Sequence, residues 1–238
     1  MRIETQPAYL LHARPYRETS LLLDAFTRDH GRVGLVARGV RRERSRLPRG
    51  LLQPLQPLVL DWVSKGELGT LTGAEAAGMP LPLAGEALFP AMYLNELVLR
   101  LSARNDPHPE AFGAYALCLS RLAGEPSPAW ALRRFERDFL AGIGYALALD
   151  RTAAGDPVEA TADYAYDPDS GPLPGDARSH WPRVSGAALL ALAGEDCPPP
   201  AQLRELRALA RAVIRHVAGG ELASWTLGRG LTAAPPPG

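Results

Sequence analysis

Hydrophobic and polar positions change their pattern once along the chain. The first part holds short apolar runs rich in Leu, Val and Tyr, separated by stretches such as Arg14-Pro15-Tyr16-Arg17, and this alternation is typical of β-strands and turns. Ser64-Lys65-Gly66 predicts a tight hairpin, and Pro54 and Pro57 restrict the start of the fourth run to an edge strand or a bulge. The pattern predicts strands at residues 8–13, 20–26, 32–40, 55–63 and 67–72. Several short strands in so small a segment favour a closed barrel, because closure removes exposed edges.

From about residue 78 onward the apolar spacing becomes helical. Ser127-Pro128 is typical of a helix N-cap followed by proline at the first helical position, and Gly142 and Gly144 close that helix. Stripes of this kind pack together as a helical bundle. The stripes consist of Leu94, Leu97, Val98 and Leu101; Phe112, Tyr115, Leu119 and Leu122; Leu132, Phe135, Phe139 and Ile143; and Leu203, Leu206, Ala210, Val213 and Val217.

These patterns predict an α+β multidomain protein. A five-stranded barrel domain covers residues 1–80, and an α-helical domain covers residues 81–238. Residues 149–183 are rich in Pro, Gly, Asp and Ala, so we expect a small irregular insertion there, with two or three short strand-like pieces around Tyr164 and Tyr166. Residues 231–238 are expected to form a disordered tail.

The composition is that of an ordinary globular protein, with 46% hydrophobic and 22% charged residues and a formal net charge of +0. Any attraction for an acidic partner must therefore come from local clustering of charge. Cys118 and Cys197 are the only cysteines and lie far apart, which excludes a disulfide scaffold and a zinc ribbon. We expect Cys118 in the core. The sequence shows neither a secretory signal nor a membrane-spanning run, so we expect a cytoplasmic protein.

Motifs of enzymatic chemistry are missing. The single lysine, Lys65, has neither the glycine spacing nor the following Ser or Thr of a phosphate-binding loop. Neither HExxH nor GxSxG occurs. The carboxylates between Asp156 and Asp169 could in principle hold a metal ion, but a solvated acidic loop is the simpler interpretation. We therefore predict a protein that is not an enzyme and has neither a metal nor another cofactor.

A cluster of arginines is the strongest signal that remains. It follows the third predicted strand and contains Glu43 as its one acidic residue. Crowded guanidinium groups repel one another, and a polyanionic partner, most commonly nucleic acid, offsets that repulsion. A small barrel beside the cluster strengthens this interpretation, because such barrels present a groove to nucleic acid; the alternative is a solvated loop on a basic face. The predicted DNA-binding residues are Arg14, Arg17, Arg32, Arg38, Arg41, Arg42, Arg44, Arg46, Arg49 and Lys65.

A second basic feature lies on the last long helix. Four arginines with helical spacing form a stripe beside the apolar face, and they are Arg204, Arg207, Arg211 and Arg215. A solvated helix flank is the simpler interpretation of this stripe. The functional alternative is a surface that receives phosphates or an acidic peptide.

The arginine cluster also belongs to a recognisable pattern. The N-terminal part of the chain resembles the RecO family of bacterial recombinational-repair proteins. The resemblance is specific over about the first 75 residues and is looser in the rest of the chain. The matching features are Arg17-Glu18-Thr19-Ser20, Phe26-Thr27-Arg28-Asp29-His30-Gly31, Ala37-Arg38-Gly39-Val40-Arg41-Arg42, Ser45-Arg46-Leu47, Leu52-Gln53-Pro54, and, in the helical half, Tyr93-Leu94-Asn95-Glu96-Leu97, Phe135-Glu136 and Leu140-Ala141-Gly142-Ile143-Gly144-Tyr145.

The resemblance implies an N-terminal OB-fold followed by a helical domain. It also implies a mediator of recombinational DNA repair that binds single- and double-stranded DNA and anneals complementary strands. Such proteins act with RecR, and in some settings RecF, to load RecA on strands coated with single-strand-binding protein, whose acidic C-terminal tail they bind. Many members carry a four-cysteine zinc site in the insertion. Here that stretch has no cysteine, so the chain resembles a zinc-free branch whose insertion is held by residues such as Tyr164, Tyr166 and Trp181.

Two other functions remain open at this level. One is a protein-interaction adaptor whose arginines bind acidic peptide tails, with only incidental affinity for DNA. The other is a metal-dependent nuclease that uses the acidic insertion. Among these, the arginine cluster favours DNA binding, and the resemblance implies a recombination mediator, which we expect to be cytoplasmic and associated with the nucleoid.

Overall fold

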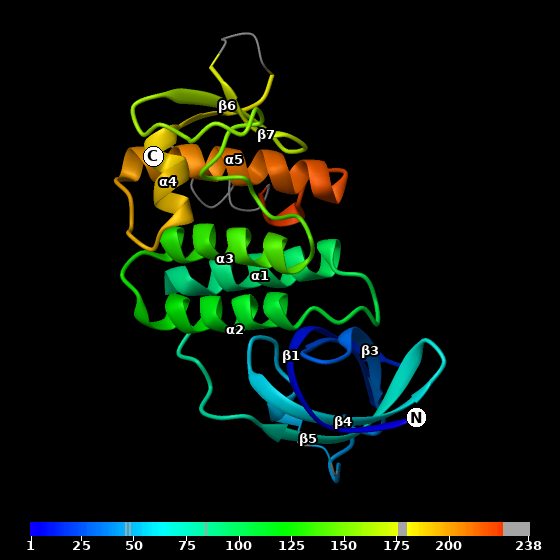
Figure 1. Ribbon diagram of the computed structural model, residues 1–238. Helices are drawn as coiled ribbons and strands as arrows, with labels where there is room; N and C mark the ends of the chain where they lie inside the picture. Colours follow the sequence, from blue (N-terminus) through cyan, green and yellow to red (C-terminus); the bar gives the residue numbers. More distant parts are fainter. Residues whose placement is uncertain (46, 48, 84, 176–179, 226–238) are drawn as a thin grey trace, which may run out of the picture. The chain divides into compact units, whose positions relative to one another are not determined.

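The chain divides into two compact units, Met1–Gly124 and Glu125–Gly238. The computed structural model describes residues 1–45, 47, 49–83, 85–175 and 180–225 (Figure 1). The tail at residues 231–238 therefore lies outside the described part. In the first unit the elements are β1 (Arg2–Tyr16), β2 (Ser20–Thr27), β3 (Gly31–Ala37), the 3₁₀ helix η1 (Arg49–Leu51), β4 (Pro57–Lys65), β5 (Leu68–Ala76), the 3₁₀ helix η2 (Gly85–Ala87), α1 (Leu88–Leu101) and α2 (Pro109–Gly124).

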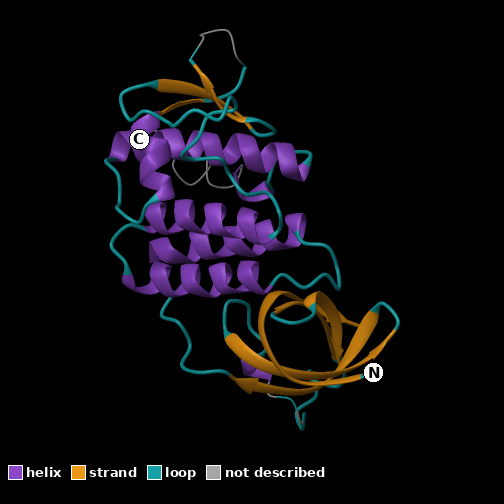
Figure 2. Ribbon diagram, in the orientation of Figure 1, coloured by secondary structure: helices purple, strands orange, loops and turns teal. Residues whose placement is uncertain are grey.

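The five strands close into a barrel (Figure 2), as the sequence predicts. Their order around it is β1-β2-β3-β5-β4. All neighbours are antiparallel except β3 and β5, which pair in parallel over Gly34–Val36 and Leu68–Thr70. Pro57 is the first residue of β4, a position where the missing N–H costs no ladder hydrogen bond. The hairpin between β4 and β5 lies where the sequence places it.

Strand β1 is much longer than the predicted segment at residues 8–13. It pairs with β4 through its first half and with β2 through its second half, and a strand with two partners must span both. Register shifts between Ile3 and Gln6 and between Leu10 and His12 bend it around the barrel. The turn predicted at residues 14–17 is wrong, because the strand continues to Tyr16 before the chain reverses.

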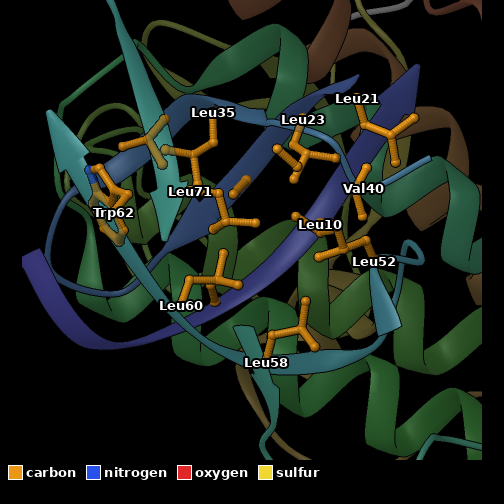
Figure 3. Packing of buried hydrophobic residues seen from close by; sticks show 14 of the residues in the cluster. Leu10, Leu21, Leu23, Leu35, Val40, Leu52, Leu58, Leu60, Trp62 and Leu71 are labelled. Carbon is orange, nitrogen blue, oxygen red and sulfur yellow. The ribbon is translucent and has the colours of Figure 1, made fainter. Parts of the chain in front are cut away.

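Leucine side chains fill the barrel (Figure 3). Alternate residues of each strand point inward, and Leu10, Leu23, Leu35 and Leu60 have no exposed surface. Gly69 of β5 passes close to this core. A Cβ atom at Gly69 would lie 2.8 Å from both a Leu35 and a Trp62 carbon, so only glycine fits there.

Helices α1 and α2 belong to the same unit as the barrel. Tyr9 and Phe26 project from the outer face of the barrel onto Phe112 and Tyr115 of α2, with ring centroids 5.1 to 5.9 Å apart. Asn95 of α1 donates to a β1 carbonyl at 3.0 Å and accepts from the Tyr115 hydroxyl at 2.5 Å. Burial of Tyr115 raises the pKa of its hydroxyl well above the usual value. The predicted domain boundary at residue 80 lies shortly after the end of β5 and stays a prediction.

The second unit combines helices with a small sheet. Its elements are α3 (Pro128–Gly142), β6 (Asp163–Asp167), β7 (Gly171–Pro174), β8 (Arg183–Ser185), α4 (Gly186–Ala193) and α5 (Pro200–Ala218). Ser127 caps α3 by accepting from the Trp130 amide, with Pro128 at the first position, as the sequence predicts. The strands pair in the order β7-β6-β8, and α5 packs against α3, α4 and β8. The predicted insertion therefore contains β6 and β7.

The predicted fold class is confirmed: a five-stranded barrel is followed by helices that carry a small inserted sheet. Tyr164 and Tyr166 are buried in that insertion, and Cys118 is buried on α2 as expected. Among the described residues, no helix has the length and apolarity needed to cross a bilayer.

Candidate nucleic-acid interface

The arginine-rich segment that follows β3 is anchored at both ends in the barrel core. Val40 is 1% exposed and Leu52 is 2% exposed, and both belong to the same apolar cluster as the barrel leucines (Figure 3). The backbone amide of Arg41 donates to the Thr19 carbonyl at 3.0 Å, which ties the segment to the turn between β1 and β2. Gly39, with a φ of +68°, makes the turn that begins the segment. The apolar anchors face inward, so the charged residues between them face solvent.

Within the part of the chain that the structure describes, no ion pair joins the guanidinium groups of this region to a carboxylate. Arg41 instead donates to the Glu18 carbonyl oxygen at 3.2 Å. Arg28, by contrast, pairs with Asp29 at 2.9 Å. Unpaired cations leave a positive potential that an anionic ligand can neutralise. The exposed residues concerned are Arg14, Arg17, Arg38, Arg41, Arg42, Arg44 and Arg49.

Three of these arginines border one cleft of about 780 Å³. Arg17 comes from the turn between β1 and β2, and Arg38 and Arg42 come from the segment after β3. The cleft is also lined by Leu68, Gly69 and Thr70 of β5, which pairs in parallel with β3. Hydroxyl groups of Thr19 and Ser20 also line the cleft, and Glu18 is its one acidic residue. Guanidinium forks and hydroxyl donors are the groups that bind phosphate oxygens.

Tyr16 is the aromatic residue that the barrel offers to this cleft. The other candidates for base stacking, Tyr9, Phe26 and Trp62, are buried. The Arg17 guanidinium lies 5.3 Å from the centre of the Tyr16 ring, and Arg17 holds a left-handed backbone with a φ of +52°. That conformation is unfavourable for a residue with a side chain. The Tyr16 ring is itself half-buried, so the described part of the cleft offers more donors for phosphate oxygens than surface for stacking bases.

Arg32 lies apart from the cleft, at the opposite end of β3 from Arg38. It is partly buried beside Arg104, and Arg104 pairs with Asp24 at 2.6 Å. Desolvation and then the Arg104 charge lower the pKa of Arg32. Arg14 and Arg49 are exposed but do not line the cleft. Arg46 and the Lys65 side chain lie outside the described residues, although the Lys65 backbone pairs with Leu68 at the cleft wall.

The arginine stripe on α5 splits into two pairs. Arg204 and Arg207 are exposed. Arg211 lies over the Trp225 ring, with 5.3 Å to its centre, and Arg215 forms an ion pair with Glu221. Arg211 and Arg215 also line a second cleft, of about 560 Å³.

Residues that sequence reasoning did not connect complete this second cleft. His180 and Trp181 precede β8 and lie beside His216 of α5. Nothing in the local sequence pairs them, because about 35 residues of chain separate Trp181 from His216. His216 also contacts Asp169 of the acidic insertion at 2.9 Å. No group of three or more His, Cys, Asp or Glu in the described residues is arranged to hold a metal ion.

Known proteins are similar in sequence to this chain over most of its length. The family model for the N-terminal part of Recombination protein O matches residues 1–80, and the model for its C-terminal part matches residues 83–226. The chain is 48% identical to the DNA repair protein RecO of Burkholderia pseudomallei (strain 1710b), over 92% of this chain and 80% of the relative.

Two further relatives match over almost their full length. The DNA repair protein RecO of Laribacter hongkongensis is 47% identical over 95% of this chain and 94% of the relative. That of Xanthomonas oryzae pv. oryzae is 43% identical over 95% of this chain and 97% of the relative. Two family models that together span the barrel and the helices, and relatives of this similarity, show that the chain belongs to the RecO family of recombinational DNA repair proteins.

Proposed function

We propose that this protein is a DNA-binding recombination mediator that grips phosphates with the arginines around the barrel cleft. One observation carries the proposal: Arg17, Arg38 and Arg42 converge on a single cleft, and each lacks a carboxylate partner among the described residues. The protein has a formal net charge of +0, so this local surface supplies the attraction for a polyanion. Phosphate contacts carry no sequence information, and the expected ligands are single- and double-stranded DNA of any sequence.

Strand annealing follows from the same chemistry. Two single strands repel each other through their phosphates, and arginines that neutralise both strands lower this barrier to pairing. The family context supports RecR, RecA and the acidic tail of single-strand-binding protein as partners, with RecF in some settings. We expect the protein to act at the nucleoid in the cytoplasm and to break no covalent bond.

Titration of labelled single-stranded and duplex oligonucleotides over a salt series tests this proposal. The logarithm of the binding constant should fall linearly with the logarithm of the salt concentration, by about 0.7 for each phosphate neutralised on a single strand. Two unrelated sequences should give the same line. Complementary strands, each labelled, should anneal faster with the protein than without it. Failure to bind oligonucleotides in dilute buffer would refute the proposal.

The same samples separate the two rival functions. An acidic peptide that binds tightly while DNA binds only weakly would identify an adaptor. Loss of full-length DNA during incubation with Mg²⁺ would identify a nuclease, and intact DNA would exclude the nuclease function.

A further inference from the structure

The cleft on α5 combines cationic groups with an aromatic wall. The α5 face is formed by Ala208, Arg211, Ala212, Arg215 and His216, and spacings of three and four residues place them on one side of the helix. Trp181 and the neighbouring His180 come from the chain before β8. All these residues belong to the second unit. The cleft is thus built from two segments that are distant in sequence and brought together by the packing of α5 against β8.

The charge of the cleft suits an anion. None of its described lining residues is a carboxylate. Glu221 and Asp169 each contact a residue of the cleft, Arg215 and His216 respectively, but neither lines it. These contacts orient the two side chains. The exposed fraction of the Arg215 side chain is 53%, which leaves N–H groups of its guanidinium for a ligand, because a guanidinium has five donors.

The aromatic wall suits a flat ring. The His180 and Trp181 rings lie 4.3 Å apart with planes inclined by 38°, and the His216 ring meets the Trp181 ring edge-on at 6.1 Å. Two alanines on α5 present only methyl groups beside them, so a planar group can approach the helix closely. A nucleotide presents a flat base joined to a phosphate, and stacking on an aromatic side chain beside a cation is the usual way to hold one. An acidic peptide matches the cationic part of the cleft, and it matches the aromatic wall only if it also carries an aromatic or apolar side chain.

We propose that the α5 cleft binds one nucleotide unit of single-stranded DNA, with its base against Trp181 and its phosphate at Arg211 and Arg215. This site is a second one, separate from the barrel cleft, and it rests on the proposed function because it assumes the same ligand. The barrel cleft offers one half-buried aromatic residue, Tyr16, and is proposed to bind through phosphates. The α5 cleft adds a contact to a base, so it distinguishes unpaired strands, whose bases can stack on protein, from duplex DNA.

Tryptophan fluorescence tests the site directly. Trp62, Trp130 and Trp225 are buried, so quenching by a stacked base reports on Trp181. A short thymidine oligonucleotide should quench the fluorescence of the full chain, and the sugar–phosphate strand without bases should not. The Trp181→Phe variant should lose the quenching but keep its affinity within about 3-fold, because phenylalanine also stacks.

Affinity measurements complete the test in a chain that carries Arg38→Ala and Arg42→Ala, which weaken the barrel site. There, Trp181→Ala should weaken thymidine binding by roughly 5- to 150-fold, the usual effect of losing one stacked base, and leave the base-free strand unaffected. Arg204→Ala with Arg207→Ala is the matched control on the same helix, and quenching should survive it. Circular dichroism confirms that each variant is folded.

The outcomes separate the two sites. Oligonucleotide binding without Trp181 quenching would overturn the α5 site and leave the barrel site standing. Quenching together with unchanged affinity on loss of Arg38 and Arg42 would support the α5 site and overturn the barrel assignment. Displacement by an acidic peptide, in the absence of any quenching by thymidine, would assign the α5 cleft to a protein partner instead and refute the inference.

Discussion

Removal of two arginines from the barrel cleft should weaken DNA binding most at low salt. The informative pair is Arg38→Ala with Arg42→Ala, because both side chains line the cleft. Arg41 is a less suitable target, since its guanidinium already donates to a backbone carbonyl of the β1–β2 turn. Neither Arg38 nor Arg42 forms an ion pair with a carboxylate among the described residues, so their loss should leave the fold intact.

The size of the effect follows from counterion release. Each phosphate contact on a single strand contributes about 0.7 to the slope of log K against log salt, so losing two contacts should flatten the slope by about 1.4. If this release supplies all of their contribution, the double variant binds roughly 70-fold more weakly at about 0.05 M salt and roughly 10-fold more weakly at about 0.2 M salt. The loss should be equal for unrelated sequences, because phosphates are common to all of them.

Fluorescence anisotropy of a labelled single-stranded oligonucleotide over that salt range measures both quantities. The control is Arg2→Ala with Arg28→Ala, which removes the same charge from the same barrel. These two arginines pair with Glu4 and Asp29 at 2.6 and 2.9 Å, so their removal should change the slope little. Equal slopes for the two double variants would refute the reasoning, since net charge rather than the cleft would then govern binding.

Three further predictions concern the framework that holds these sites. Gly69→Ala should destabilise the protein by about 1–3 kcal/mol through overpacking of the barrel core, and an unchanged urea midpoint would contradict this. Asn95→Ala should cost about 2 kcal/mol, because a buried carbonyl and the Tyr115 hydroxyl lose their partner; Tyr115→Phe should cost less, and the reverse order would be inconsistent with this network. Burial raises the pKa of Tyr166 to about 12. The contribution of the neutral Tyr166 side chain to stability is therefore complete below about pH 10 and is lost as the pH rises through about 12. Unfolding free energies of wild type and Tyr166→Phe should therefore diverge by about 2–3 kcal/mol across that range, in favour of the variant, and parallel curves would argue against it.

Local patterns were sufficient to predict the barrel and four of the helices, but not α4. The short apolar runs supply the core in Figure 3, and the Ser127 cap and the apolar helical stripes need only a few neighbouring residues to define them. The extent of β1 could not be predicted in this way. Its first half is a strand because β4, more than fifty residues later, pairs with it, and no short window of sequence contains both partners.

The same limit explains which of the predicted arginines lie together in the structure. Arg38 and Arg42 are close in sequence and share a cleft. Arg32 is also close in sequence, but an extended strand of six residues covers roughly 20 Å, which places it at the other end of β3 beside Arg104. Arg17 joins the cleft through strand pairing, which its sequence position alone does not reveal.

On α5, helical spacing identified the arginines but not their surroundings. Trp225 and Glu221 engage Arg211 and Arg215 after the chain turns back at the end of the helix. Trp181 reaches the same helix face only through tertiary packing, so its role in a cleft is visible only in the structure.

Closure of the barrel restricts the ways in which a partner protein can bind. A peptide that binds by extending a sheet needs a row of unpaired backbone donors and acceptors. In the closed barrel of the first unit, each strand is paired with a neighbour on both sides, so the barrel leaves no such edge. The inserted sheet of the second unit ends in β7 and β8, and β7 carries Pro172 and Pro174, which have no N–H to offer. We therefore expect that a protein tail binding to the described part of this molecule would be recognised chiefly by side chains, where single substitutions can change the choice of partner without altering the backbone.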